Sequence, residues 1–435
     1  MVTLFKSILQ SLYRWLTHSQ PGSRILPSNF FNVQMDAIGV GMASAALPFV
    51  AVFLARLGAD SYQVGLITSM PAIAGLLLSI PMGQYIETRK NIVPWYSISR
   101  AIGLSRFAII GLVPFFFKDE NAIMAILVIW AIFTLPQTLL ANMFNFLMNM
   151  VAGPAGRYEL LSRRWSIIGI TTAVTVFLAG QILDRVVFPV NYQIVFILFS
   201  LGGVFSYRYS KRLLIPDQID PPKYKGKGLF RIYRELFDLV KHEPPFLNFA
   251  SKRFVFTFGL TMVSPLLTLY YVRQIGAPDS WIALFSTVQT LLNFVGYFMW
   301  LRVSHTKTSR FILVSTTFVM SFYPLMVAIT NRFWMLAVFA AVQGLFEAGL
   351  NLVFFDELMK TVPLNRSATF VSIAQSLQFV ASMGAPIIAT FLSDQIGLSY
   401  SLMAAAVVQL LGFFMFWRGK PMKNEKPDEN PVQTG

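Results

Sequence analysis

The chain contains twelve apolar segments, each long enough to cross the roughly 30 Å hydrocarbon core of a lipid bilayer. Several contain a proline, which membrane helices tolerate because neighbouring helices satisfy the freed backbone groups. We therefore predict an all-α integral membrane protein with twelve transmembrane helices. The predicted spans are 31–55, 62–84, 92–117, 122–148, 163–183, 191–209, 252–272, 281–301, 310–330, 332–355, 367–391 and 398–417.

Composition excludes a soluble protein. Hydrophobic residues make up 55% of the chain and charged residues 13%, whereas soluble domains average about 45–50% and 25%. The absence of cysteine excludes disulfides and thiolate metal sites, and the three histidines are too scattered to bind a metal. We therefore expect no cofactor and no metal.

One long hydrophilic stretch, residues 208–253, separates the twelve spans into two groups of six. It is basic, and the pairs Pro221-Pro222 and Pro244-Pro245 interrupt it. Apolar residues between the prolines recur at helical spacing, which is typical of a helix lying on a membrane surface. The predicted units are an interfacial N-terminal helix (1–26), a six-helix bundle (27–210), a cytoplasmic linker with an amphipathic helix (211–250), a second six-helix bundle (251–418) and a disordered cytoplasmic tail (419–435).

The basic residues lie mostly on one predicted side of the membrane. Of the 35 Lys and Arg residues, most fall in the termini, the linker and the loops on the same side as these. Such residues stay cytoplasmic, so we expect both termini in the cytoplasm and the protein in the cell membrane, inner or plasma. The charge then indicates contact with anionic lipid headgroups and not with nucleic acid. The opposite loops contain only Arg56, Lys118, Arg185, Arg273 and Arg332.

The two groups of spans resemble each other in sequence. Residues 57–62 (LGADSY) reappear as 275–281 (IGAPDSW), and Pro154–Arg157 matches Pro363–Arg366. With the second pair aligned, Asn142 falls on Asn351. The halves are therefore interpreted as parallel copies with a substrate site at their interface.

The loop between the second and third spans contains Gly83, Glu87, Arg89 and Lys90, with Pro81 just ahead. Together with twelve spans in two repeated halves, this loop resembles the signature of the major facilitator superfamily of secondary transporters. Glu87 replaces the usual Asp, and the later Gly of the signature is missing. The resemblance implies the fold of that superfamily and a monomeric carrier of a small-molecule substrate.

The resemblance also implies a conformational latch on the cytoplasmic side. A glycine lets two helices approach closely, and a carboxylate can face the positive N-terminal end of another helix. Glu87 would contact the start of the eleventh span near Arg366. The alternative is that these are solvated loop charges. The predicted latch residues are Gly83, Glu87, Arg89, Lys90, Arg157 and Arg366.

Polar residues inside the membrane are costly and usually functional. The tenth span places three of them on one face at i, i+4 and i+8, and the fourth span has a comparable stripe. The resemblance implies that spans one, four, seven and ten line the central cavity. The alternative is hydrogen bonding between helices, worth on the order of 0.6–2 kcal/mol each. The predicted substrate-binding residues are Gln343, Asn351, Thr138, Asn142 and Asn145.

Two carboxylates are candidates for proton coupling. Glu347 lies roughly 12 Å from the cytoplasmic end of its span at 1.5 Å per residue. A carboxylate there must be paired or protonated, and a group poised between these states can carry a proton. Asp36, nearer the start of the first span, is the second candidate. For Glu347 the alternative is a permanently paired structural carboxylate.

Two arginines lie inside the third predicted span. Arg106 is close to mid-membrane and Arg100 is at a depth similar to that of Asp36. We expect structural pairing, of Arg100 with Asp36, and the alternative is a site for an anionic substrate.

These features predict a transporter and not a membrane-embedded enzyme, because no nucleophile elbow, metal motif or phosphate-binding loop is visible. The first hypothesis is proton-coupled efflux of an amphipathic or cationic compound by alternating access. The second is proton-coupled or facilitative uptake of a small polar nutrient such as a sugar.

The predicted topology can be tested in this cysteine-free chain by labelling single introduced cysteines. We expect Lys225→Cys to react with an impermeant thiol reagent only from the cytoplasmic side and Asp119→Cys only from outside. The reverse pattern, or labelling of both from one side, contradicts the twelve-span topology.

Overall fold

The computed structural model describes residues 25–87, 89–215, 241, 243–361 and 367–419. The predicted N-terminal interfacial helix, the amphipathic helix of the linker and the tail beyond residue 419 lie outside these residues.

The described residues form helices in two consecutive groups. Twelve helical segments are long and apolar enough to cross a membrane, which confirms the number of predicted spans. The first group is α2 (Pro27–Ser44), α3 (Leu47–Arg56), α4 (Ser61–Glu87), α5 (Val93–Phe116), α6 (Asp119–Arg185) and α7 (Val190–Ser210). The second is α9 (Pro244–Leu269), the π-helix η1 (Tyr270–Gln274), α10 (Asp279–Ser304), α11 (Ser309–Ala328), α12 (Phe333–Thr361), α13 (Ser367–Ile396) and α14 (Leu398–Trp417).

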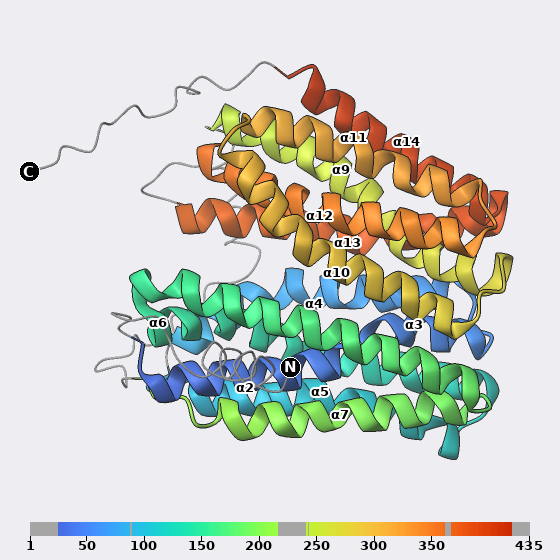
Figure 1. Ribbon diagram of the computed structural model, residues 1–435, viewed down its shortest axis with the longest axis horizontal. Coiled ribbons are helices and arrows are strands. Elements are labelled where there is room, and N and C mark those ends of the chain that lie inside the picture. Colours follow the sequence, from blue (N-terminus) through green and yellow to red (C-terminus); the bar gives the residue numbers. More distant parts are fainter. Residues whose placement is uncertain (1–24, 88, 216–240, 242, 362–366, 420–435) are drawn as a thin grey trace, which may run out of the picture.

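Each group packs as a bundle of its own. In the first half α5 lies against α6 and α7, and α2 lies against the same two helices. In the second half α10 packs on α12, and α9 packs on α13 and α14. Figure 1 shows the blue-to-green first half below the yellow-to-red second half. The halves meet mainly where α4 contacts α13 and where α6 contacts α10.

Two predicted boundaries are wrong. The loop expected before residue 163 is absent, because α6 is helical from Asp119 to Arg185 and contains both the fourth and the fifth span. The seventh helix begins at Pro244, inside the stretch predicted to be linker. The proline pair that indicated a break instead occupies the first turn of α9, where the missing N–H has no intrahelical partner to lose. Arg253, at the edge of the predicted span, therefore lies in the third turn of the helix.

The first span of each half is irregular after its proline. The first span divides into α2 and α3 at Ala45-Ala46, with Pro48 in the first turn of α3. In the seventh span, Pro265 precedes η1, where the Ile275 N–H donates to the Tyr270 carbonyl at 3.1 Å. A π-turn changes the direction in which the following side chains point. Arg273 lies in this π-turn, so the turn affects the direction of its side chain.

The apolar cores differ between the two ends of the molecule. We call the end that contains residues 56–61 and 274–279 the closed end, and the end where α2 begins and α14 ends the terminal end. At the closed end one continuous core joins both halves and includes Phe53, Tyr192, Leu266 and Phe285. Toward the terminal end the halves have separate cores, around Phe246 and Phe354 in the second half and around Phe30 and Leu147 in the first.

Close contact between α10 and α12 depends on Gly344. A Cβ atom at this position would lie 2.2 Å from the Gln289 carbonyl oxygen, which real contacts do not allow. We expect Gly344→Ala to separate the helices and lower the melting temperature of the detergent-solubilised protein, by a cost of about 1–3 kcal/mol.

Gly169 in α6 is the matched control, because a Cβ atom there meets nothing within 4 Å. Gly169→Ala should leave stability unchanged or raise it, since alanine favours a helix by up to about 1 kcal/mol over glycine. Equal melting temperatures for the two variants would show that this contact does not constrain the fold.

Candidate functional site

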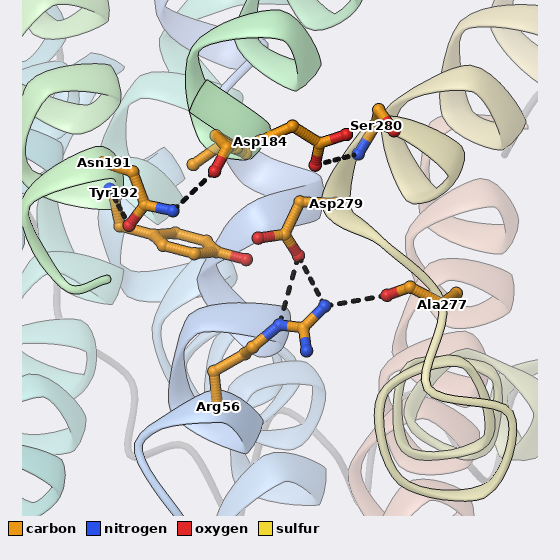
Figure 2. A network of polar contacts seen from close by, with 8 residues as sticks. Arg56, Asp184, Asn191, Tyr192, Ala277, Asp279 and Ser280 are labelled. Atoms are coloured by element: carbon orange, nitrogen blue, oxygen red, sulfur yellow. Dashed lines mark hydrogen bonds and ion pairs between the residues drawn. The ribbon is translucent and has the colours of Figure 1, made fainter. Parts of the chain in front are cut away.

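An ion pair between the halves lies at the closed end. Arg56, the last residue of α3, donates through Nη2 to Asp279 Oδ1 at 2.9 Å and to the Ala277 carbonyl at 2.8 Å (Figure 2). The Asp279 side chain is only 9% exposed, and the Tyr192 hydroxyl is directed toward it. A charged hydrogen bond is shorter and stronger than a neutral one. This contact therefore holds the start of α10 to the first half.

The second half contributes an arginine in the same way. Arg273 donates to the Ala59 carbonyl and, at 3.1 Å, to Ser61 Oγ. Each arginine thus reaches the alanine carbonyl of the repeated Gly-Ala sequence in the other half. The preceding glycines, Gly58 and Gly276, have positive φ angles of 94° and 58°, which side-chain-bearing residues rarely adopt. The repeat seen in the sequence is therefore a pair of equivalent turns.

Two aspartates at helix ends complete this junction. Ser61 Oγ donates to Asp394 Oδ1 at 2.6 Å, and the backbone N–H of Ser280 donates to Asp184 Oδ1 at 3.0 Å. Asp184 ends the fifth span and Asp394 ends the eleventh, so these contacts are also related by the repeat. We call the set of Arg56, Ala59, Ser61, Asp184, Arg273, Ala277, Asp279, Ser280 and Asp394 the interhalf lock.

The interhalf lock was not predicted from the sequence. Arg56 and Arg273 were expected only as loop charges on the side poor in basic residues. The repeated LGADSY and IGAPDSW segments were the available signal. The repeated segments alone do not show that each turn faces the equivalent turn of the other half.

The predicted polar face of α12 lies against α10. Gln289 Nε2 donates to Glu347 Oε2 at 3.3 Å, and Asn351 Nδ2 donates to the Tyr297 hydroxyl at 3.5 Å. Between them, Asn293 Nδ2 donates to the Gly344 carbonyl at 3.3 Å. Gln289, Asn293 and Tyr297 also follow i, i+4, i+8 spacing. The structure thus pairs two polar stripes, of which sequence analysis identified only the one on α12.

Glu347 has no ion-pair partner among the described residues. Its one hydrogen-bond partner there is the neutral amide of Gln289. One turn earlier, Gln343 Oε1 is buried without a hydrogen-bond partner. The structural alternative, a carboxylate neutralised by a buried arginine, is therefore absent from the part of the chain that the structure describes.

A cavity of about 260 Å³ lies in the second half between α9, α12 and α13. Asn351, a predicted substrate-binding residue, lines it together with Arg253, Thr257, Gln375 and Gln378. These residues belong to the parts of the three helices that lie toward the terminal end. The cavity is therefore on the opposite side of the molecule from the interhalf lock.

Part of the predicted polar stripe of the fourth span forms hydrogen bonds within its own helix. Thr138 Oγ1 donates to the Thr134 carbonyl at 2.9 Å within α6, and Thr138 is buried. This is the usual way for a helical threonine to satisfy its hydroxyl. Asn142 is partly buried, and the side chain of Asn145 lies outside the described part of the structure. A role of these residues in substrate binding stays a prediction.

Asp36 lies in the core of the first half. Arg164 Nη2 donates to Asp36 Oδ2 at 3.0 Å, Ser206 Oγ donates to Oδ1, and Arg100 Nε lies 3.8 Å from Oδ1. The Asp36 and Arg164 side chains are each 2% exposed. The predicted pairing of Arg100 with Asp36 is confirmed. Arg164, the second residue of the predicted fifth span, is a further buried partner of Asp36 that the sequence did not indicate.

Arg106 is stabilised by aromatic rings. Its guanidinium carbon lies 4.3 Å from the centroid of the Trp130 ring and 4.9 Å from that of Phe107. It forms no ion pair within the described part of the chain. A cation–π contact away from water can stabilise a charge by about 2 kcal/mol.

Most of the predicted latch lies outside the described side chains. Gly83, Glu87 and Arg157 belong to helices whose side chains are not described at these positions, and Arg366 lies in an undescribed segment. Arg89 is partly buried, with its guanidinium carbon 5.0 Å from the centroid of the Trp95 ring, and Lys90 is exposed. The latch stays a prediction.

The structure consists of two six-helix bundles joined at one end, with a polar cavity inside the second bundle toward the other end. Residues 249–434 match the family model described as Major Facilitator Superfamily. No curated protein sequence matches the chain significantly.

Solved transporters share this fold at low sequence identity. The nucleoside transporter NupG superposes with a TM-score of 0.70 at 11% identity, covering 90% of this chain and 99% of that structure, and a point mutant of NupG gives 0.73 at 9%, covering 89% and 98%. A bacterial homologue of the human lysosomal transporter Spinster, inward-facing and unoccupied, gives 0.69 at 13%, covering 91% and 97%. The second half of the chain thus matches the model of this superfamily, and the described chain has the fold of these solved transporters.

Asp279→Asn should weaken the interhalf lock, because it removes the charge that Arg56 contacts. Spin labels on Lys118→Cys and Arg332→Cys, exposed positions in the two halves near the closed end, report the opening by pulsed electron resonance. We expect longer and broader label distances in the Asp279→Asn protein.

The control is Asp356→Asn, which makes the same charge change in an exposed ion pair with Lys360 near the terminal end. It should leave the distances as in the parent protein. An unchanged distribution for Asp279→Asn would show that the ion pair does not hold this end closed.

Proposed function

We propose that this protein is a secondary active transporter that works by alternating access, with Glu347 as the site of proton coupling. The observation that carries the proposal is the difference between the two ends. One apolar core and the interhalf lock join the halves at the closed end, whereas toward the terminal end each half has its own core. Rocking of one half against the other around a central site is the mechanism such a repeat permits.

We further place the termini in the cytoplasm of the cell that carries the protein in its membrane. The support is the distribution of Lys and Arg in the sequence. On this orientation the closed end faces outward, and the cavity beside Asn351 is reached from the cytoplasm. A compound can then load from inside the cell, as efflux requires.

The contacts of Glu347 support its assignment as the coupling group. A partly buried carboxylate with one neutral partner can gain a proton without leaving a buried cation unpaired. Asp36 is less suited, because Arg164 and Arg100 compensate its charge. The predicted cationic substrate is also disfavoured, because Arg253 lines the cavity. We therefore propose efflux of an amphipathic molecule that is not a cation.

A second candidate is uptake of a small polar nutrient. The amides of Asn351, Gln375 and Gln378 at the cavity are suited to hydroxyl groups. NupG, whose fold is similar, is a nucleoside transporter. Flux measured in both directions in proteoliposomes, with and without a pH gradient, separates uptake from efflux. Absence of flux for every solute class would contradict the proposed transport.

Glu347→Gln tests the coupling. The substitution mimics the protonated acid and can retain the hydrogen bond with Gln289, so we expect a stable protein. Flux driven by a pH gradient should collapse, while solute exchange without a gradient survives.

The matched control is Asp356→Asn, which should retain gradient-driven flux. The melting temperature of each variant is measured beside the two flux assays. A stable Glu347→Gln protein with unchanged gradient-driven flux would remove Glu347 from the mechanism.

A further inference from the structure

Arg253 is the charged residue at the cavity. It lies in the third turn of α9, roughly 14 Å along the helix from Pro244 at 1.5 Å per residue. Its guanidinium carbon is 5.2 Å from the centroid of the Phe354 ring, and its Nε is buried without a hydrogen-bond partner. The side chain is therefore held at the cavity wall with donor capacity unused.

The acidic side chains of helices α9–α14 all have other partners. Asp279 pairs with Arg56, Asp356 and Glu357 pair with Lys360, Asp394 accepts from Ser61, and Glu347 accepts from Gln289. Arg253 forms no ion pair with any described residue. An uncompensated charge at this depth is costly unless water or a counter-ion reaches it.

Three other arginines inside the membrane spans are buried and do not border this cavity. Arg100 and Arg164 face Asp36, and Arg106 is 4% exposed between two aromatic rings. Arg253 differs because it is only partly buried and borders an open volume of about 260 Å³. Among these four cations it is the one that a ligand can reach.

The rest of the cavity wall complements an anion with an apolar body. The amide groups of Asn351, Gln375 and Gln378 can donate hydrogen bonds beside the guanidinium. Leu350, Phe355 and Val371 form apolar parts of the same wall. A guanidinium presents its donors in a planar fork that matches a carboxylate or a phosphate.

We propose that this cavity binds the carboxylate or phosphate group of an amphipathic anion through Arg253. The inference rests on the proposed transport function, because it names the class of molecule that the carrier takes. Two sources could supply the anionic group, a transported solute or the headgroup of a lipid.

Three probes of nearly equal shape separate charge from fit: benzoate, benzamide and benzamidinium. Binding is measured by calorimetry on the full-length protein in nanodiscs of neutral lipid. We expect benzoate to bind at least tenfold more tightly than benzamide, and benzamidinium to bind most weakly. All three binding equally weakly, or a preference for benzamidinium, would overturn the proposal.

Arg253→Gln should remove the preference for benzoate, and Arg253→Lys should retain it in weakened form. Arg302→Gln is the matched control, because Arg302 is exposed and outside the cavity, and this variant should bind benzoate as the parent does. The melting temperature of each variant is recorded. If Arg253→Gln does not fold, the weakened benzoate preference expected of Arg253→Lys is the test. Unchanged benzoate preference in a folded Arg253→Gln protein would also overturn the proposal.

The same measurement in anionic lipid identifies the source of the anion. Competition by the lipid, seen as loss of benzoate binding, assigns the site to a headgroup, whereas unchanged binding assigns it to a solute. Flux assays keep this test separate from that of transport. A protein that binds benzoate but moves no solute refutes the transport function alone, and a protein that transports while binding benzoate no better than benzamide refutes this inference alone.

Discussion

The junction at the closed end is the constraint on which the arrangement of the two halves depends. Its apolar part is a core shared by both halves, and its polar part is the interhalf lock around Arg56 and Arg273. A hydrogen bond to a charged group contributes about 1.5–3 kcal/mol when it is protected from water. The polar contacts join turns and helix ends of the two halves.

Each buried charge must be stabilised away from water, and the structure does this in different ways. Asp36 and its arginines neutralise one another, and breaking such a group costs about 3–5 kcal/mol because a charge remains unpaired. Arg106 is stabilised by ring faces, and Glu347 by a neutral amide. Arg253 borders open space. Asp36 and its arginines in the first half are thus paired with one another, whereas Glu347 and Arg253 in the second half have no ion-pair partner among the described residues.

This asymmetry separates the tasks of the two halves. Glu347 and Asn351 lie on one face of α12, with the cavity beside Asn351 and the Gln289 contact one turn away. A proton on Glu347 and an anion at Arg253 would both reduce local charge in the same bundle. The repeat mate of Glu347 in α6, Thr138, satisfies its hydroxyl within its own helix. The coupling proposed for Glu347 would then involve the second half, while the first half provides the opposite side of the junction.

The sequence alone predicts the number of membrane spans and the repeat, because segment length and residue order are local properties. It also placed Glu347, Gln343 and Asn351 on one helix face. The helices that these faces contact cannot be read from the sequence. The partners Gln289, Asn293 and Tyr297, the burial of Arg164 and the reciprocal arginines all depend on contacts between distant segments. The seventh helix begins eight residues before its predicted span because proline marks a helix start as readily as a break, and sequence alone does not distinguish the two.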